Sequence, residues 1–361
     1  MDISKIDKNF APKEFSDDGK IGYYTLPCEP FDIYGVYYEK ETERFVRMPS
    51  DIADRVNDGV KILNGHTAGG RIRFSTDSDI VSVAVTYREL WEMDNMPLAG
   101  SAGFVLLEET DKGFRHIQTF KPRNITYDAA YGTHFELSAG LKGGKMRNYI
   151  MFMPIYNDVR ILKIGLSKNA NIAHGKPYLK VKPILYYGSS ITQGGCASRP
   201  DNCYQAIISK RNNIDYINLG FSGNGKAEPI ICDYLAGIDC SVFVCDYDHN
   251  APDADYLEKT HYALYKTFRG NQPTTPVVFI SKPDIEHDKR WRKRRNIIKC
   301  TYLRAVKDGD KNVYFIDGSK FFGKERSVCT VDGCHPNDVG FSKMAKKIGA
   351  VLDKIISGEK K

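Results

Sequence analysis

The first half of the chain alternates apolar and polar residues over short runs, the pattern of strands with one buried face. Turn-forming residues separate the runs, which extend from about residue 22 to residue 168 and include 71–74, 81–87, 104–108, 114–120, 149–156 and 160–166. Many short strands joined by turns predict an all-β, jelly-roll-like antiparallel sandwich. A helical pattern interrupts them at residues 50–63, where Ser50 is a candidate N-cap.

The second half changes to apolar runs that alternate with helical patterns, which predicts a parallel sheet covered by helices on both faces. Strands are expected near residues 184, 216, 242, 277 and 313, with helices over 203–211 and 256–268 and a last amphipathic helix with Phe341 and Ile355 on one face. Residues 169–182 follow neither period and contain Gly175 and Pro177. The sequence thus predicts two domains, residues 1–175 and residues 182–361, joined by a linker.

Composition and charge narrow the class of protein. The 361 residues are 42% hydrophobic, enough for sizeable cores, and the net charge of +7 is too small to argue for nucleic acid as a partner. The first eight residues, MDISKIDK, carry charges where a signal peptide needs an apolar run, and no apolar run approaches the ~20 residues of a membrane helix. We therefore expect a cytoplasmic protein with no membrane partner, and we interpret its nine cysteines as reduced thiols.

A candidate nucleophile follows the first predicted strand of the second half. Residues 184–194 read ILYYGSSITQG, so the apolar run ends at Gly188 and Ser190 lies just beyond it, at the sheet edge where α/β folds bind ligands. Serine is common in turns for structural reasons, so Ser190 alone is a weak signal. Far along the chain, however, Asp332 precedes His335 by three residues, ahead of the last helix. That spacing lets the carboxylate bind one imidazole nitrogen while the other faces outward.

These motifs resemble the SGNH (GDSL-type) hydrolase superfamily from about Lys182 to the C-terminus. The resemblance implies a flavodoxin-like, three-layer α/β domain with a Ser-His-Asp triad. The family's Gly-Asp-Ser motif is Gly-Ser-Ser here, with Ser190 as the nucleophile and Ser189 in place of the aspartate. Asp332 and His335 fit the family's last motif without change.

The same resemblance implies an oxyanion hole. Its donors are the backbone N–H of Ser190, the backbone N–H of Gly223 in the segment NLGFSGN, and the side chain of Asn250. Asn250 is the only residue kept from the family's third motif, Gly-x-Asn-Asp. The implied reaction is ester hydrolysis through an acyl-enzyme, for which no metal or organic cofactor is needed.

Two further residues near these motifs are candidates for substrate binding. His249 lies beside Asp246 and Asp248, a set that could ligate a metal, but at the end of a strand it is more simply interpreted as lining the pocket. Arg199 either binds substrate or ties down its loop. The basic run at residues 289–295 is interpreted as the solvated face of a helix rather than a nucleic-acid patch, and Cys329 and Cys334 as packing or loop residues.

An N-terminal β-sandwich ahead of such a domain resembles some bacterial carbohydrate esterases, which implies removal of short acyl groups, above all acetyl, from a carbohydrate. The loops expected around Ser190 are polar nearly throughout, including 192–195, 224–226 and 248–250, and favour a small acyl group in a small-molecule or oligosaccharide ester. The alternatives are a lipid or thioester substrate, a metal-dependent phosphoesterase and a non-catalytic sugar-binding protein. The sequence leaves homo-oligomer formation open.

Overall fold

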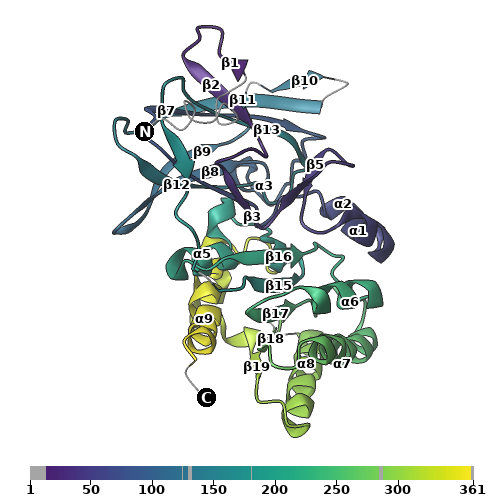
Figure 1. The fold of residues 1–361 in the computed structure, drawn as a ribbon. Coiled ribbons are helices and arrows are strands. Elements are labelled where there is room, and N and C mark those ends of the chain that lie inside the picture. The colour runs from purple at the N-terminus through teal and green to yellow at the C-terminus, as the bar shows by residue number, and fades with distance from the viewer. Residues whose placement is uncertain (1–13, 124, 129–131, 180, 284–287, 359–361) are drawn as a thin grey trace. The chain divides into compact units, whose positions relative to one another are not determined.

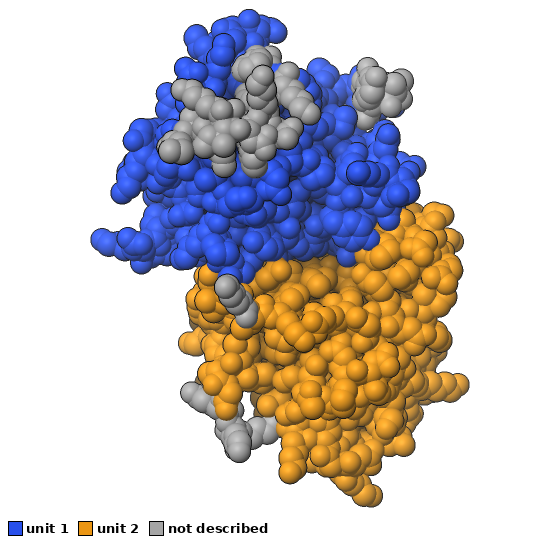
Figure 2. All heavy atoms as spheres, in the orientation of Figure 1, with its two compact units in different colours: residues 1–47, 65–178, 198–201 blue, residues 48–64, 179–197, 202–361 orange. Residues whose placement is uncertain are grey.

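The computed structural model describes residues 14–358 apart from 124, 129–131, 180 and 284–287 (Figure 1). The chain divides into two compact units, coloured in Figure 2. The first contains residues 1–47, 65–178 and 198–201, and the second contains residues 48–64, 179–197 and 202–361. A single predicted linker does not account for residues 48–64 and 198–201, which belong to the unit of the opposite half of the chain.

The described residues of the first unit form two large antiparallel sheets, as the alternating pattern predicts, and a two-stranded antiparallel sheet, β4-β5. One large sheet has the strand order β1-β2-β13-β7-β11-β10, and the other has the order β14-β6-β12-β8-β9, with β3 beside β6. The elements are β1 (Glu14–Phe15), β2 (Ile21–Thr25), β3 (Asp32–Tyr34), β4 (Tyr37–Glu39), β5 (Arg44–Val46), β6 (Arg71–Thr76), β7 (Ile80–Tyr87), α3 (Leu98–Ser101), β8 (Phe104–Thr110), β9 (Gly113–Phe120), β10 (Thr126–Asp128), β11 (Gly132–Gly140), β12 (Arg147–Phe152), β13 (Val159–Ser167) and β14 (Ile172–His174).

The alternation places one face of each sheet in a shared apolar core. Val81, Val83 and Val85 of β7 lie in that core with Phe74 of β6 and Leu106 of β8. All six strands predicted by the pattern are present. The predicted linker is wrong in one respect: it contains β14, because Ile172 is buried in this core and pairs with Thr76 of β6.

The second unit is built on a five-stranded parallel sheet with the order β16-β15-β17-β18-β19. Numbered along the chain from β15, this order is 2-1-3-4-5, that of flavodoxin-like folds. The strands confirm all five predicted positions: β15 (Ile184–Gly188), β16 (Tyr216–Gly220), β17 (Val242–Asp246), β18 (Val277–Ile280) and β19 (Val313–Ile316).

Helices cover both faces of this sheet and make the expected three layers (Figure 1). On one face, the ring of Tyr186 in β15 contacts Tyr204, which in turn stacks on Phe341. On the other face, Tyr187 lies in the core with Leu235 and Ile298. The helices are α4 (Ser190–Gln193), α5 (Tyr204–Asn212), α6 (Pro229–Gly237), α7 (Ala254–Asn271), α8 (Lys289–Lys307) and α9 (Asp338–Ile356), with short 3₁₀ turns η3 (Pro200–Asn202), η4 (Gly318–Lys320) and η5 (Gly323–Val328). Among the described residues, none of the helices has the length and apolar character to cross a membrane.

Residues 48–64 join the second unit because their apolar side chains lie in its core. They form α1 (Ser50–Val56) and α2 (Asp58–Leu63), and Ala53 and Val60 are buried with Leu219 and Phe221. The predicted helical pattern is confirmed, but the predicted N-cap is wrong, because Ser50 is the first residue of α1 and Pro49 precedes it.

Candidate active site

The predicted site residues follow three neighbouring strands of the parallel sheet. β15 pairs with β16 on one side and with β17 on the other, so the chain reverses its direction of winding around β15. Such a switch point is where open α/β sheets bind ligands. Ser190 follows β15, Gly223 follows β16 and Asn250 follows β17.

The ends of these strands approach one another closely at Gly188. Its carbonyl accepts the N–H of Phe221 at 2.9 Å, and the next residue, Ser189, donates its N–H to the carbonyl of Asp246 at 3.0 Å. A Cβ placed on Gly188 would lie 2.1 Å from that carbonyl oxygen. Only glycine allows the three strand ends to meet here.

The structure brings Ser190, His335 and Asp332 into one hydrogen-bonded chain. Ser190 Oγ lies 2.8 Å from His335 Nε2, and His335 Nδ1 lies 2.7 Å from Asp332 Oδ2. Because an ionised carboxylate only accepts hydrogen bonds, Nδ1 carries a proton and, in the neutral ring, Nε2 accepts from the serine hydroxyl. This is the arrangement that activates a serine in triad hydrolases.

The loop before α9 fixes the aspartate. Burial alone would raise the pKa of Asp332, but hydrogen bonds from the backbone N–H and ring of His335 and from the backbone N–H of Cys334 hold that pKa well below its usual range. The carboxylate therefore stays ionised wherever the imidazole can act as a base. The last helix, α9, begins at Asp338, and the Asn337 side chain caps it by accepting the N–H of Gly340 at 3.1 Å.

The predicted oxyanion donors differ in whether they already donate hydrogen bonds within the protein. No acceptor is found among the described residues for the backbone N–H of Ser190 or of Gly223. Gly223 has a φ of +68°, a left-handed conformation that favours glycine. The Asn250 amide donates one hydrogen to the carbonyl of Phe221 at 2.9 Å, which leaves its second hydrogen for a ligand.

Asn57 supports the Gly223 loop, and sequence reasoning missed it. Its side-chain nitrogen donates to the carbonyl of Asn224 at 3.2 Å and to Glu228 Oε1 at 2.7 Å, while its oxygen caps α2 by accepting the N–H of Val60. Asn57 is 167 residues from Asn224 in the chain, and no local pattern marks the contact.

Two residues predicted to form a polar rim are instead completely buried. Thr192 Oγ1 donates to Asp246 Oδ2 at 3.3 Å, and Gln193 Oε1 accepts the N–H of Ser222 at 2.9 Å. Their polar atoms hold the strand ends together, so they are unavailable to a sugar. Ser222, Asn224 and Lys226, on either side of Gly223 and beyond it, are polar residues that remain partly exposed.

His249, a candidate for substrate binding, makes hydrogen bonds to two side chains of the protein. Its Nε2 hydrogen-bonds Ser189 Oγ, its Nδ1 lies 2.9 Å from Asp248 Oδ1, and its side chain is only 5% exposed. Both ring nitrogens already have protein partners. The same contacts do not fit a metal ligand, although Asp246, Asp248 and His249 do cluster, as do Cys196, Asp332 and His335.

Arg199 belongs to the first unit and forms a bidentate ion pair with Asp201. Its Nε lies 3.0 Å from Asp201 Oδ1 and its Nη2 lies 3.1 Å from Asp201 Oδ2. This pairing ties down the loop, one of the two roles expected for Arg199. Its role in substrate binding stays a prediction.

The basic run is helical, as predicted, but it is not solvated throughout. Arg294 of α8 is buried, together with Ile298, Thr301 and Ala305 of the same helix. Arg294 Nη1 donates to the carbonyls of Asp248 and Ala251 at 2.6 and 2.7 Å. This arginine thus holds the loop that carries His249 and Asn250.

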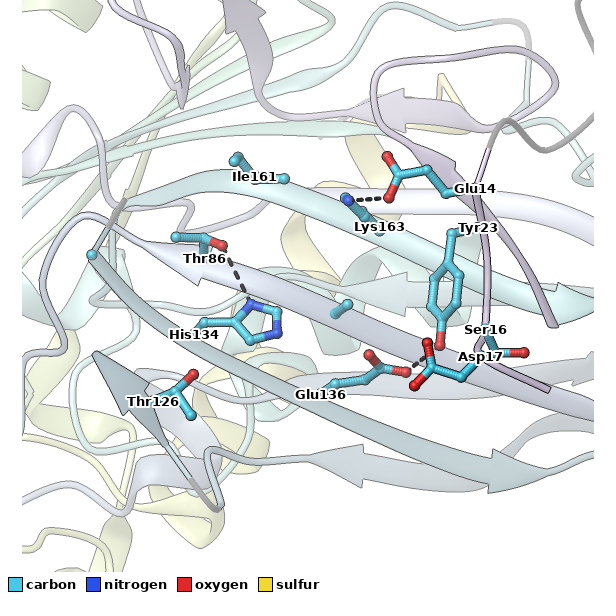
Figure 3. A pocket seen from close by; sticks show the side chains of 12 residues that line it. Glu14, Ser16, Asp17, Tyr23, Thr86, Thr126, His134, Glu136, Ile161 and Lys163 are labelled. Atoms are coloured by element: carbon cyan, nitrogen blue, oxygen red, sulfur yellow. Dashed lines mark hydrogen bonds and ion pairs between the residues drawn. The ribbon is translucent and has the colours of Figure 1, made fainter. Parts of the chain in front are cut away.

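A cavity of about 710 Å³ lies on one sheet of the first unit and contains none of the predicted site residues (Figure 3). Six of its polar lining residues are paired with one another: Thr86 with His134, at 3.4 Å, Lys163 with Glu14, and Tyr23 with Glu136. The Tyr23 hydroxyl has a pKa raised to about 12 by burial and by this bond to Glu136.

Comparison with known proteins agrees with the fold. Residues 181–353 match the model of the GDSL-like Lipase/Acylhydrolase family, and residues 21–172 match a model described as "N-terminus of Esterase_SGNH_hydro-type". No curated protein matches the chain.

Three solved structures illustrate the similarity. A GDSL-like lipase from Bacteroides ovatus is 27% identical, with a TM-score of 0.83 over 93% of this chain and 98% of that chain. A salicylyl-acyltransferase from a tetracycline biosynthetic pathway is 17% identical, with a TM-score of 0.76 over 94% and 98%. An acetyl xylan esterase from Butyrivibrio proteoclasticus is 12% identical, with a TM-score of 0.55 over 93% and 99%. Since the two family models together span both halves, the chain is an SGNH (GDSL-type) hydrolase, a carboxylic ester hydrolase with an N-terminal all-β domain.

Proposed function

We propose that this hydrolase removes short acyl groups, above all acetyl, from a carbohydrate by forming an acyl-enzyme on Ser190. The observation that supports this proposal most strongly is the hydrogen-bonded chain from Ser190 through His335 to Asp332. The ligand is then a small-molecule or oligosaccharide ester.

In the first half-reaction, His335 Nε2 takes the hydroxyl proton as Ser190 Oγ attacks the ester carbonyl. Asp332 holds the ring in the tautomer that accepts this proton and stabilises the imidazolium that results. The carbonyl oxygen becomes negative, and the N–H groups of Ser190 and Gly223 with the second amide hydrogen of Asn250 receive it. His335 then protonates the departing sugar oxygen.

In the second half-reaction, water replaces the sugar. His335 takes a proton from the water as it attacks the acyl carbon, the same donors receive the oxyanion, and Ser190 leaves with the proton that His335 returns. One oxyanion donor typically contributes ~10²–10³ in rate.

The preference for a short acyl group rests on the side chains near the site. Ser222, Asn224 and Lys226 are polar and partly exposed, whereas the exposed apolar side chains closest to His335 in sequence are Val331 and Val339. A long chain would forgo ~0.8 kcal/mol for each CH₂ left in water.

The structural neighbours add an analogy for the acceptor. One is named an acetyl xylan esterase, and another is a family two carbohydrate esterase from Clostridium thermocellum in complex with cellohexaose. At 12% and 14% identity they share the fold with this chain. They therefore suggest acetylated xylo- and gluco-oligosaccharides as first substrates to assay.

The test is a series of p-nitrophenyl esters from acetate to decanoate, assayed beside acetylated xylo-, gluco- and manno-oligosaccharides. We expect kcat/KM to be highest for acetate and acetate to be released from at least one oligosaccharide. A kcat/KM that rises with chain length, with no acetate released from any sugar, would contradict the proposal and favour a lipid or thioester substrate.

A further inference from the structure

A second hydrogen-bonded chain of the same three residue types lies beside the first. Ser189 Oγ hydrogen-bonds His249 Nε2, and His249 Nδ1 lies 2.9 Å from Asp248 Oδ1. Ser189 immediately precedes the nucleophile, and His249 immediately precedes the oxyanion donor Asn250. The chain therefore connects the two segments that carry these groups.

The direction of each hydrogen bond follows from chemistry. Asp248, as a carboxylate, accepts from Nδ1–H, so in the neutral ring His249 Nε2 accepts and the Ser189 hydroxyl donates to it. The Ser189 oxygen in turn accepts the N–H of Ile191 at 3.1 Å, which makes Ser189 the N-cap of α4. With its hydroxyl fixed from both sides, Ser189 holds the turn that presents Ser190.

The other end of the chain is anchored just as firmly. Asp248 Oδ2 accepts the backbone N–H of Lys282 at 3.1 Å, and Arg294 donates to the carbonyls of Asp248 and Ala251 on either side of Asn250. The carboxylate and backbone of Asp248 therefore have fixed positions, from which His249 reaches to Ser189.

This second chain is unsuited to attack a substrate. Ser189 is completely buried, and Asp248 is 1% exposed. Ser190 keeps 6% of its surface exposed, whereas a hydroxyl with none can be oriented by a histidine but cannot reach an ester carbonyl. Its position next to both a nucleophile and an oxyanion donor indicates a different use.

We propose that Ser189, His249 and Asp248 form a positioning relay, which sets the separation between the Ser190 N–H and the Asn250 amide in the oxyanion hole. This inference rests on the proposed serine-esterase function. Displacement of a catalytic group by ~1 Å can cost ~10²-fold in rate. The relay would thus act on kcat through Asn250 and Ser190, while ground-state substrate binding stays the same.

The test uses the full chain and two readouts: kcat and KM for p-nitrophenyl acetate, and the second-order rate constant for labelling by a fluorophosphonate probe, which needs no knowledge of the natural substrate. The variants are Ser189→Ala, His249→Leu, His249→Gln and the double variant Ser189→Ala/His249→Leu. Ser209→Ala is the matched control, because Ser209 is also buried and donates to a backbone carbonyl, that of Ile214, at 2.6 Å. Melting temperatures establish that each variant is folded.

We expect Ser189→Ala and His249→Leu each to lower kcat and the labelling rate by about 10- to 100-fold with KM changed less than about 3-fold. The double variant should be no slower than the slower single variant, because both break one chain. His249→Gln, whose amide oxygen can accept from Ser189, should recover part of the loss. In an Asn250→Ala background, His249→Leu should cost less than in the wild type.

Three results would overturn the relay. These are losses that multiply in the double variant, a His249→Leu effect that falls on KM, and single variants that match Ser209→Ala. The failure of the proposed function is distinguishable from these, since a wild type that neither hydrolyses esters nor labels at Ser190 would remove both proposals together.

Discussion

The two Ser-His-Asp chains of this hydrolase have the same hydrogen-bonding pattern but different surroundings. In the chain that contains Ser190, the His335 and Asp332 side chains are 24% and 33% exposed, whereas in the chain that contains Ser189 the His249 and Asp248 side chains are 5% and 1% exposed. A hydrogen-bonded triad is therefore not sufficient to identify a catalytic site. The hydroxyl must also be reachable by an ester, and donors must be available where its carbonyl oxygen will lie.

The two chains also differ in what surrounds the carboxylate. Asp332 accepts two backbone N–H groups within its own loop, whereas Asp248 accepts a backbone N–H from Lys282, 34 residues away. The first arrangement joins residues close in sequence, and the second joins residues far apart in sequence. We therefore expect substitutions of Ser190 and Asp332 to remove the chemical step, and substitutions of Ser189 and Asp248 to misplace the groups that perform it.

The largest difference should come from the serines themselves. Ser190→Ala should lower kcat by ~10⁴–10⁶, because triad members act as a unit, while Ser189→Ala costs at most about 100-fold. Initial rates with p-nitrophenyl acetate measure both. If the two substitutions exchanged effects, the nucleophile would be Ser189.

The aspartates come next. Asp332→Asn should lower kcat by about 10⁴, because an amide no longer fixes the tautomer that accepts the serine proton. Asp248→Asn should be milder by at least tenfold, since in our account His249 transfers no proton. Equal losses in the two variants would mean that the buried chain also takes part in proton transfer.

The oxyanion donor should have a smaller effect. Asn250→Ala should lower kcat by ~10²–10³ with little change in KM, because the amide binds charge that exists only in the transition state. Steady-state kinetics separate the two constants. A variant that changed KM alone would place Asn250 in ground-state binding instead.

The smallest effect concerns the free energy of unfolding and the carboxyl group of Asp246, which lies 3.9 Å from His249 Nδ1. Burial raises the pKa of Asp246 to about 6, against the opposing influence of His249. The native state therefore holds the Asp246 proton more tightly than the unfolded chain does. The stability that this proton contributes is fully present below the unfolded pKa near 3.8 and is lost as the pH rises to the folded pKa of about 6.

Asp246→Asn removes that pH dependence while keeping an acceptor for Thr192. Relative to the wild type, the variant should become progressively more stable between about pH 4 and pH 6, by up to about 3 kcal/mol. Denaturant unfolding at a series of pH values measures the difference. A difference that stays flat across this range would mean that Asp246 titrates alike in the folded and unfolded states.

Much of the fold, and the hydrogen-bonded set of Ser190, His335 and Asp332, was predictable because the sequence signals are local. The period of apolar residues marks the strands, Ser190 follows the apolar run that ends at Gly188, and Asp332 and His335 lie three residues apart. The hydrogen bonds that join Ser189, His249 and Asp248 were not predictable, because Ser189 and His249 are 60 residues apart and meet only through the pairing of their strands. Arg294 was misassigned for a similar reason: a charged residue in a basic run gives no sign that backbone carbonyls of another loop will bury it.

The most direct test of the account is to find which of the two adjacent serines becomes covalently modified. After reaction with a fluorophosphonate, fragment ions from the peptide that contains residues 189 and 190 distinguish the two positions. We predict complete labelling on Ser190, no labelling of the Ser190→Ala variant, and slower labelling, still on Ser190, in Ser189→Ala. Modification of Ser189, or undiminished labelling of Ser190→Ala, would contradict the assignment of Ser190, His335 and Asp332 as the catalytic triad.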